Sequence, residues 1–360
     1  RRTVMENKKF RIGIIGCGGI ANGKHMPALK AVDECEMVAF CDIIVERAQA
    51  AAEKFGVEGA AVYADYKELL KDETIDVVHV CTPNRSHSFI TVDSLESGKH
   101  VMCEKPMALY PEECEAMIKT ADECGKLLMI GQVCRCTPAF VKAKEIVDSG
   151  VIGDLFFVES EYAHDYANER VKGVDKWRAT PERDPFIGGG CHAVDLLRWI
   201  AGDPTETMAY SNHKMLPDWP TNDMTISIMK FPNNVMGKVY VSTGCKRGYT
   251  MRTVLYGTKG TIVVDNSSPT FTLFLDNEEG YTFGGKLKGI SEKGIQHLIP
   301  VSINNHNVTE EHKQFYDSIV NGTPLIATAR EGAKTVAVCR AAIESAETGA
   351  PVKIDYSFCE

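Results

Sequence analysis

The sequence predicts an α/β protein with a doubly wound parallel sheet in its N-terminal part and an open, mainly antiparallel sheet in a C-terminal α+β domain. Two observations carry this prediction. Between residues 10 and 131, short apolar segments alternate with helical patterns, which is typical of parallel strands joined by crossover helices. After residue 133, strand patterns follow one another with short polar turns, which favours antiparallel pairing.

Length and composition indicate two domains in a globular chain. At 360 residues the chain exceeds one ordinary domain, and we place the two domains at 8–133 and 134–360. The net charge of −9 argues against nucleic acid as a partner. No run of apolar residues is long enough for a membrane span, so we expect no membrane partner either.

The thirteen cysteines are scattered along the chain, and none of them forms a CxxC pair. Disulfides are rare in the reducing cytoplasm, and metal sites usually need closely spaced ligands. We therefore expect buried free thiols, a cytoplasmic protein and no metal site.

A glycine-rich turn follows the first apolar segment, residues 10–15. Its sequence, Gly16-Cys-Gly-Gly-Ile-Ala21, has the GxGxxA spacing of a Rossmann dinucleotide-binding loop. Gly16 permits the tight turn, Gly18 lets the backbone approach a pyrophosphate, and Ala21 leaves room between helix and strand. The helix that begins here offers unpaired N–H groups to that phosphate. We therefore predict a Rossmann domain in the N-terminal part.

The next predicted strand, residues 37–41, ends in Asp42. An acidic residue at this point in a Rossmann domain binds the ribose hydroxyls of the adenosine. A carboxylate repels the 2′-phosphate of NADP, and Ile43 and Ile44 stand where an arginine would accommodate it. These residues favour NAD as the cofactor.

The parallel pattern continues to Gly131. Strands are predicted at 77–81, 99–103 and 127–131, and helices at 44–55, 66–71, 88–97 and 111–124. The carboxyl ends of parallel strands meet at one sheet edge, where ligands bind. The turn Thr82-Pro83-Asn84 and the segment Glu104-Lys105-Pro106 both begin at this edge. Gln132 follows the last of these strands.

The C-terminal part has a different pattern. Strands are predicted at 154–164, 205–211, 224–231, 235–242, 251–256 and 261–264, and helices at 138–149, 188–201, 309–321 and 329–348. Residues 265–305 give no clear pattern. The second helix follows a glycine run that contains Gly188 and leads into His192.

Four segments together resemble the Gfo/Idh/MocA family, the glucose–fructose oxidoreductase and inositol dehydrogenase relatives. These segments are Gly16–Ala21, Cys81–Asn84 with His87, Gly98–Pro106, and Trp177-Arg178 with His192–Asp195. The resemblance implies a Rossmann domain and a second domain whose open sheet is used for homo-oligomers. It also implies an NAD(P)-dependent oxidoreductase that acts on a sugar, cyclitol or related polyol.

The resemblance also implies site residues. Lys105 matches the family lysine that touches the reacting hydroxyl, and His192 matches the catalytic histidine. Many relatives carry an aspartate four positions before that histidine, where this chain has Gly188. The family's Lys–Asp–His set is therefore incomplete here. Predicted NAD ligands are Gly16, Gly18, Gly19, Ile20, Asp42, Thr82, Pro83, Asn84, His87, Glu104, Lys105 and Gln132.

Oxidising a secondary alcohol requires a base within hydrogen-bond reach of its O–H group. Histidine has a reference pKa of about 6.5 and can take that proton at neutral pH, so we predict His192 as the base. We predict that Lys105 polarises the oxygen. Asp195, one turn beyond His192, either orients the imidazole or caps and pairs elsewhere, for instance with Arg198, and we favour the structural role.

Other residues are candidates for contacts with the substrate. The predicted substrate ligands are Lys105, Arg135, His164, Trp177, Arg178 and His192. His164, with Asp165, Tyr162 and Tyr166, ends a strand that either faces the nicotinamide or forms a polar surface. Trp177 and Arg178 either line a sugar pocket or belong to the core. We expect His79 in the core, and His213, His297, His306 and His312 facing solvent.

Three functional hypotheses remain at this point. The first is oxidation of a sugar, glycoside or cyclitol, with one form giving a 3-keto glycoside that a partner lyase consumes. The second is an NAD-dependent glycosidase that acts through a transient keto intermediate. The third is a non-catalytic NAD(P)-binding regulator, which the presence of both Lys105 and His192 argues against.

Overall fold

The computed structural model describes residues 9–167, 178–275, 295–304 and 306–360. Their contacts divide the chain into two compact units. The first unit comprises the chain up to Val133 together with His306–Ala337 and Asp355–Glu360. The second unit comprises Cys134–Asn305 and Val338–Ile354.

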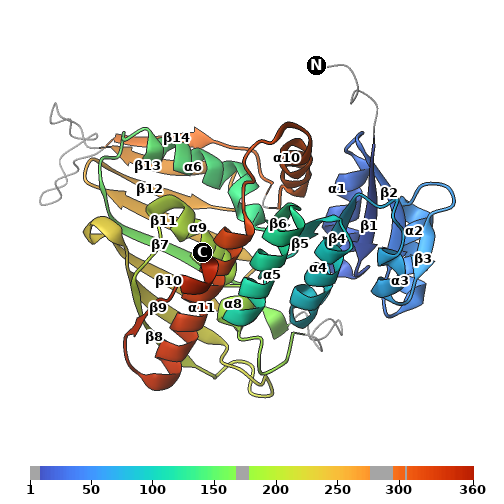
Figure 1. The fold of residues 1–360 in the computed structure, drawn as a ribbon. Coiled ribbons are helices and arrows are strands. Elements are labelled where there is room, and N and C mark those ends of the chain that lie inside the picture. The colour runs from blue at the N-terminus through green and yellow to red at the C-terminus, as the bar shows by residue number, and fades with distance from the viewer. Residues whose placement is uncertain (1–8, 168–177, 276–294, 305) are drawn as a thin grey trace, which may run out of the picture. The chain divides into compact units, whose positions relative to one another are not determined.

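The first unit contains a six-stranded parallel sheet with strand order β3-β2-β1-β4-β5-β6 (Figure 1). The strands are β1 Phe10–Ile15, β2 Cys35–Cys41, β3 Ala61–Tyr63, β4 Val77–Val80, β5 His100–Cys103 and β6 Leu128–Ile130. Because the order runs outward from β1 in both directions, the sheet is doubly wound, and the predicted Rossmann fold is confirmed.

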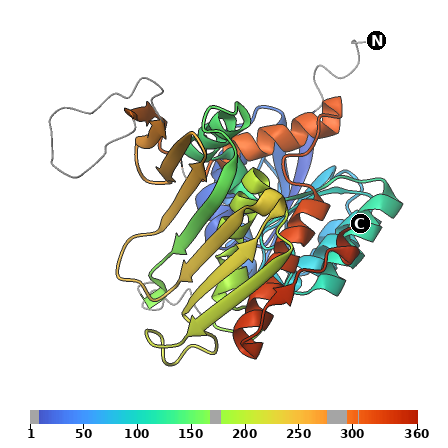
Figure 2. The ribbon, with the colours of Figure 1, turned by 90° about the vertical axis from the view of Figure 1, so that its left-hand side faces the viewer.

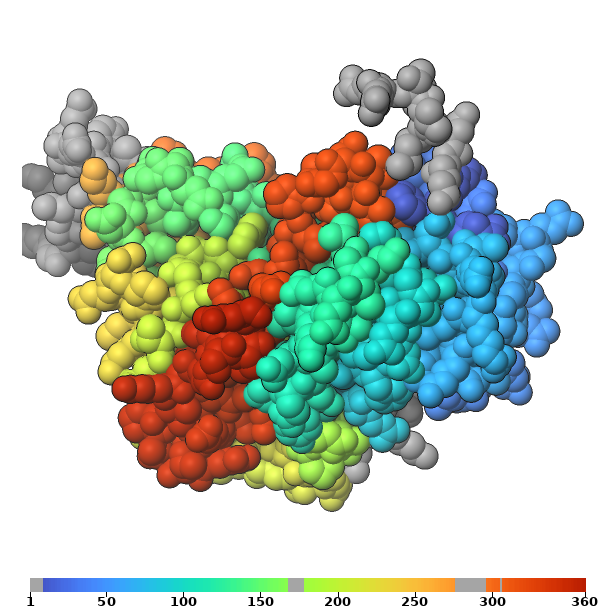
Figure 3. Space-filling model, in the orientation of Figure 1, coloured from blue at the N-terminus to red at the C-terminus, as the bar shows by residue number. Residues whose placement is uncertain are grey.

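Helices join these strands. They are η1 Ala21–His25, α1 Met26–Lys30, α2 Val45–Phe55, α3 Tyr66–Leu70, η2 Asn84–Ser86, α4 His87–Glu96 and α5 Pro111–Cys124. Of these, α2, α3, α4 and α5 lie within one residue of the bounds predicted for them. Local signals explain such bounds: α5 has a capping box from Tyr110 and Glu113, and it ends at Gly125 with φ 59°. Helices α4 and α5 pack side by side at the surface (Figure 3).

The first unit also includes α10, Val308–Asn321, and the short helix η5, Ser357–Cys359. The prediction that assigned all of 134–360 to the second domain is corrected on this point. Phe315 and Tyr316 of α10 are buried among residues of β1 and β2, including Ile12 and Met37. The apolar face of α10 completes the core of the first unit, because burial of this surface is the main stabilising term.

The second unit contains a nine-stranded sheet with strand order β14-β13-β12-β11-β7-β10-β9-β8-β15. The strands are β7 Leu155–Ala163, β8 Glu206–Asn212, β9 Met224–Lys230, β10 Met236–Ser242, β11 Thr250–Gly257, β12 Gly260–Asp265, β13 Thr270–Leu275, β14 Ile295–Pro300 and β15 Val352–Lys353. Neighbours pair antiparallel except β7 and β10, which are parallel. The mainly antiparallel sheet is as predicted, and β13 and β14 lie in the stretch that gave no clear pattern.

The two faces of this sheet differ. On β7, Val158 and Ser160 are buried, whereas Glu159 and Glu161 are only partly covered. Helices pack on the buried face: α6 Pro138–Asp148, α8 Pro185–Gly188 and α9 Cys191–Ala201. Over the other face no helix of the described residues is seen (Figure 2).

Two further findings concern the whole described chain. Helix α11, Ala329–Thr348, begins in the first unit and ends in the second. None of the described helices is long and apolar enough to cross a membrane. All thirteen cysteines lie in described segments and are free thiols, as predicted.

Candidate functional site

The glycine-rich loop lies between β1 and η1 in the first unit. Gly16 has φ +93°, and a Cβ there would stand 2.7 Å from the carbonyl carbon and oxygen of Cys81. Only glycine fits this close approach between the ends of β1 and β4. A Cβ on Gly18 or Gly19 would meet nothing within 4 Å. The loop therefore presents open backbone at Gly18 and Gly19, as a pyrophosphate site requires.

Asp42 follows β2 and lies beside this loop. Its Oδ2 accepts a hydrogen bond of 2.9 Å from the N–H of Cys17, and its Oδ1 accepts one of 2.8 Å from the N–H of Ile44. These bonds fix the carboxylate at the sheet edge, next to the open glycines. Ribose hydroxyls can donate to the remaining lone pairs of the two oxygens.

The turn after β4 is tied to the segment after β5. The ring nitrogens of His87 lie 2.8 Å from the carbonyl oxygen of Pro106 and 2.9 Å from that of Thr82. Burial lowers the pKa of His87, so the neutral ring donates to one of these carbonyls. Asn84 donates a long bond of 3.5 Å to the carbonyl oxygen of Lys105. The ring of His87 thus lies between the turn after β4 and the segment after β5, both at the carboxyl edge of the sheet.

Glu104 anchors the segment that carries Lys105. Its Oε1 lies 2.7 Å from Nε2 of His25, and its Oε2 accepts a 3.0 Å hydrogen bond from the N–H of Lys105. Burial alone would raise the pKa of Glu104, but the hydrogen bond and charge of His25, followed by Lys105 and His87, lower it to about 2. Glu104 is therefore an anion that holds the backbone N–H of Lys105, and the peptide bond between Lys105 and Pro106 is cis.

Gln132, after β6, is buried to 1% exposure, yet neither Oε1 nor Nε2 has a hydrogen-bond partner. Buried amides are normally paired, so this side chain is suited to a ligand. The open glycines, the fixed carboxylate of Asp42 and the amide of Gln132 all lie at the carboxyl edge of the sheet in the first unit. Together they form a site that fits NAD. Thr82, Pro83 and Asn84 stand at the same edge, at the end of β4.

His192 lies in the first turn of α9 in the second unit. A Cβ on Gly189 would stand 2.5 Å from the ring of Tyr162, so this glycine lets the helix start pack closely on β7. The rings of Tyr162 and His192 are stacked, with centroids 6.4 Å apart and planes at 24°. The Sγ of Cys134 lies 3.5 Å from Nδ1 of His192. The imidazole is thus oriented from two sides.

Further aromatic residues surround Tyr162. Its hydroxyl lies 3.1 Å from Nδ1 of His164 and 3.3 Å from the hydroxyl of Tyr166. The guanidinium of Arg178 lies 5.3 Å from the centroid of the Tyr166 ring. Burial raises the pKa of Tyr162 and Tyr249 well above the usual value, so both phenols stay protonated at neutral pH. Predicted residue Trp177 lies outside the described residues.

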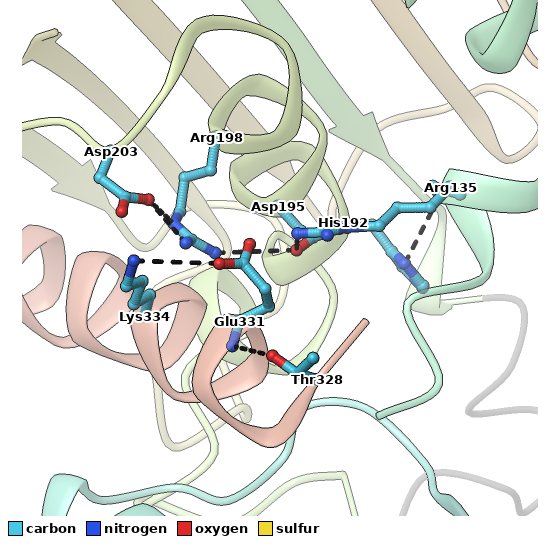
Figure 4. Close-up of polar contacts among 9 residues, drawn as sticks. Arg135, His192, Asp195, Arg198, Asp203, Thr328, Glu331 and Lys334 are labelled. Carbon is cyan, nitrogen blue, oxygen red and sulfur yellow. Dashed lines mark hydrogen bonds and ion pairs between the residues drawn. The ribbon is translucent and has the colours of Figure 1, made fainter. Parts of the chain in front are cut away.

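A chain of charged side chains lies behind His192 (Figure 4). Nε and Nη2 of Arg135 donate to Asp195 at 2.9 and 2.8 Å. Arg198 lies 3.8 Å from the same carboxylate and 2.6 Å from Asp203. Asp195 thus has the structural pairing that was expected, here mainly with Arg135. A contact between Arg135 and the substrate stays a prediction.

Gly188, at the position where the family resemblance implied an aspartate, is buried beside Arg183. The guanidinium carbon of Arg183 would lie 2.5 Å from a Cβ at this position. Its Nη2 donates a 3.1 Å hydrogen bond to the carbonyl oxygen of Gly188. A cationic group therefore occupies the space of the first side-chain atoms of that aspartate.

Several of these residues were missed by the sequence analysis, namely His25, Cys134, Arg183 and Tyr249. His25 had a detectable signal, because it lies four residues after Ala21 and both are buried on one helix face. The expectation for His312 is wrong, since its ring is fully buried in the first unit. His306 is only partly exposed, whereas His213 and His297 face solvent as expected.

Comparisons with known proteins agree with this description. The family model described as "Oxidoreductase family, NAD-binding Rossmann fold" matches residues 10–132, and the model "GFO/IDH/MocA C-terminal domain" matches residues 140–263. Myo-inositol 2-dehydrogenase of Thermotoga maritima is 28% identical over 359 residues, with 96% of this chain and 99% of that protein covered. D-glucoside 3-dehydrogenase of Escherichia coli is 34% identical over 208 residues, with 56% and 57% covered.

Solved structures show the same fold. A levoglucosan dehydrogenase in complex with NADH superposes with a TM-score of 0.83 at 20% identity, covering 97% of this chain and all of that one. At this identity the likeness establishes the fold.

Proposed function

Because the chain belongs to the Gfo/Idh/MocA family of NAD-binding oxidoreductases, we propose that it oxidises a secondary hydroxyl of a sugar, glycoside or cyclitol. The relatives support this substrate class, since two of them are named for inositol and for a D-glucoside. In rings of both kinds the reacting hydroxyl is secondary. The first unit binds NAD, and the second unit supplies His192.

The observation that carries the proposal is the anchoring of Lys105. Its peptide N–H is held by Glu104, which is itself held by His25 at 2.7 Å. An ammonium group on a fixed backbone, at the sheet edge that carries the glycine loop, can stabilise a developing alkoxide without reorganising.

NAD, when bound, supplies the acceptor for the hydride of the carbinol carbon. His192 removes the hydroxyl proton, and we assign this role to Nε2 because Nδ1 faces the thiol of Cys134. Lys105 polarises the oxygen during the same step. Positioned acid–base groups of this kind contribute about 10²- to 10⁴-fold to a rate.

A panel of substrates tests the proposal. Purified protein is mixed with NAD and with myo-inositol, glucose or an aryl glucoside, and formation of NADH is followed by its absorbance. Products are then identified by NMR, which distinguishes a 3-keto glycoside from an inosose or a lactone. Reduction of NAD by at least one ring polyol is expected, and a 3-keto product would indicate a partner lyase downstream.

The same panel distinguishes the two competing functions. Release of the aglycone without net formation of NADH would instead identify an NAD-dependent glycosidase. Binding of NADH, seen by fluorescence, without turnover of any sugar would identify a regulator.

Two substitutions test the assigned roles. His192→Ala should lower kcat by about 10²-fold or more, since a positioned base contributes that much. Lys105→Met should lower kcat sharply while NAD affinity stays close to that of the parent. His297→Ala, on exposed β14, serves as the control and should change neither. A His192→Ala enzyme within a few-fold of the parent would reject the base assignment.

We also propose that the chain forms a homo-oligomer through the open face of the nine-stranded sheet. This face carries large exposed apolar side chains, with Tyr210 at 63%, Ile228 at 53% and Met236 at 54% exposure. Burying them between copies would be favourable. Light scattering coupled to gel filtration should give a multiple of the chain mass, and Ile228→Lys should lower it. A monomer at micromolar concentration would reject the proposal.

A further inference from the structure

Three histidines from distant parts of the sequence meet inside the first unit. They are His25 on η1, His79 on β4 and His312 on α10, and their rings are exposed by 1%, 0% and 0%. One ring nitrogen from each can be chosen so that all three lie within 4.8 Å of one another. A buried group of three imidazoles is unusual, because polar rings in a core normally find separate partners.

The closest pair already has the spacing of two metal ligands. Nδ1 of His25 lies 3.3 Å from Nε2 of His312. Two nitrogens that bind one tetrahedral Zn²⁺ at about 2.0–2.1 Å are about 3.3–3.4 Å apart. The three nitrogens lie within 4.8 Å of one another, so His79 would have to move inward by up to about 1.4 Å to reach the same spacing.

Two of the rings also have polar partners outside the cluster. Nε2 of His25 lies 2.7 Å from Oε1 of the ionised Glu104, so Nε2 donates to this carboxylate and Nδ1 is the nitrogen that faces His312. Nε2 of His79 lies 2.9 Å from the hydroxyl of Tyr316, and its Nδ1 is buried without a partner. Carboxylate and hydroxyl groups behind metal-bound histidines are the usual way in which such rings are oriented.

We propose that His25, His79 and His312 bind a divalent first-row transition metal ion such as Zn²⁺, with Glu104 and Tyr316 orienting two of the rings. Three imidazole ligands suit Zn²⁺, Co²⁺, Ni²⁺ and Fe²⁺ rather than Ca²⁺ or Mg²⁺, which prefer oxygen. A water molecule completes the tetrahedron, as at other three-histidine sites.

Two of the three rings are in the neutral form that a metal ligand needs. Burial, followed by the charges of neighbouring histidines, lowers the pKa of both His79 and His312 well below the usual value. Neutral rings have the lone pairs that a metal ion needs. Glu104 contacts the far side of the His25 ring, at Nε2. Its negative charge would offset part of the charge that a divalent ion brings into the core.

The ion would have a structural role. It connects the helix after the glycine loop, strand β4 and helix α10, and through His25 it supports Glu104 beneath Lys105. Binding to the folded state alone raises the free energy of unfolding in proportion to the logarithm of metal concentration over Kd. The inference does not depend on the proposed substrate.

Metal content tests the proposal directly. The full-length protein is freed of metal with a chelator, incubated with excess Zn²⁺ or Co²⁺, passed over a desalting column and analysed by inductively coupled plasma mass spectrometry. One ion per chain and a higher melting temperature with metal than with chelator are expected. The Co²⁺ form should show visible d–d bands without the near-ultraviolet band of a thiolate ligand, because the thirteen cysteines are the competing donors.

Variants assign the ion to this cluster. His79→Gln and His312→Gln should each reduce bound metal to less than about a tenth of an ion per chain, since two ligands hold zinc far more weakly than three. His213→Gln and His297→Gln, both exposed in the second unit, are matched controls that should retain it. If either buried variant fails to fold, the Co²⁺ spectrum of the parent protein decides. Metal-free parent protein after incubation, or a thiolate spectrum, would overturn the proposal.

Discussion

The guanidinium of Arg183 lies against Gly188 and donates a 3.1 Å hydrogen bond to its carbonyl oxygen. A Cβ at position 188 would stand 2.5 Å from the guanidinium carbon. Position 188, where the family resemblance implied an aspartate, therefore has no room for a side chain unless a buried arginine moves.

We predict that Gly188→Ala destabilises the second unit by about 1–3 kcal/mol, as overpacking of a filled core does. The melting temperature measures this loss. Gly23→Ala is the matched control, because a Cβ there meets nothing within 4 Å. Arg183→Ala combined with Gly188→Ala should cost less than the sum of the single changes. An additive result would mean that the two residues do not compete for the same space.

In the glycine loop, we expect Gly18→Ala to impair NAD binding and Gly16→Ala to impair stability. Gly18→Ala leaves stability unchanged but weakens NAD binding, since the new methyl group stands in open space where a pyrophosphate approaches. Gly16→Ala lowers stability, because it combines φ +93° with a 2.7 Å approach to Cys81. Calorimetric titration with NAD and thermal melts separate the two effects. Tight NAD binding by Gly18→Ala would contradict this assignment.

The thiol of Cys134 should affect the chemistry of His192 more than the fold. Cys134→Ala removes the group 3.5 Å from Nδ1, and loss of one hydrogen bond of about 0.5–1.5 kcal/mol corresponds to a drop in kcat of about 2- to 10-fold. NAD affinity should not change. Cys245→Ala, in the same unit and partly exposed, is the control. Equal losses in kcat and in NAD affinity would point to a general structural effect.

Asp184 should make stability depend on pH. Burial raises the pKa of Asp184 from 3.8 to about 6, although the hydrogen bond from the N–H of Phe186 acts in the opposite direction and lowers it. Because the folded state binds this proton more tightly than the unfolded chain, stability falls as pH rises from about 4 to about 6. Above about pH 6, ionisation of Asp184 lowers the free energy of unfolding by at most about 3 kcal/mol.

Asp184→Asn keeps an N-cap for α8 but cannot ionise. Melting temperatures of the variant and the parent, recorded between pH 4 and 7.5, should therefore converge at the acidic end. The variant should be the more stable of the two near neutrality. Parallel curves across the whole range would rule out Asp184 as the titrating group.

Local signals predicted most of the elements. The helix 111–124 was predicted to the residue, because Pro111 begins it and Gly125 ends it. The spacing of the glycines and the position of Asp42 predicted which edge of the first sheet binds the nucleotide, since both signals depend on short segments of the chain. By contrast, β13 and β14 were not predicted, because the alternation Thr270-Phe271-Thr272-Leu273 is short and gives way to two consecutive apolar residues.

Side-chain partners were harder to predict than elements. Asp195 has its expected structural pairing, but its main partner, Arg135, lies 60 residues away and was taken for a substrate ligand. His312 reads as a polar position of an amphipathic helix, and only the packing of α10 on β1 and β4 shows that it is buried. The thiol beside His192 comes from a short helix, η3 Val133–Cys136, with no motif of its own.

The sequence by itself determined the classes of the two sheets and the NAD loop, because strand periodicity and turn glycines act over a few residues, while the roles of Lys105 and His192 stay predictions from the family resemblance. Tertiary structure decided what surrounds them: the anion of Glu104 that holds Lys105, the arginine at Gly188 and the three histidines brought together in one core. Arg183 is only five residues from Gly188, but His25 is 79 residues from Glu104 and 287 residues from His312. The geometry of these contacts depends on how complete faces pack, and no local pattern specifies that.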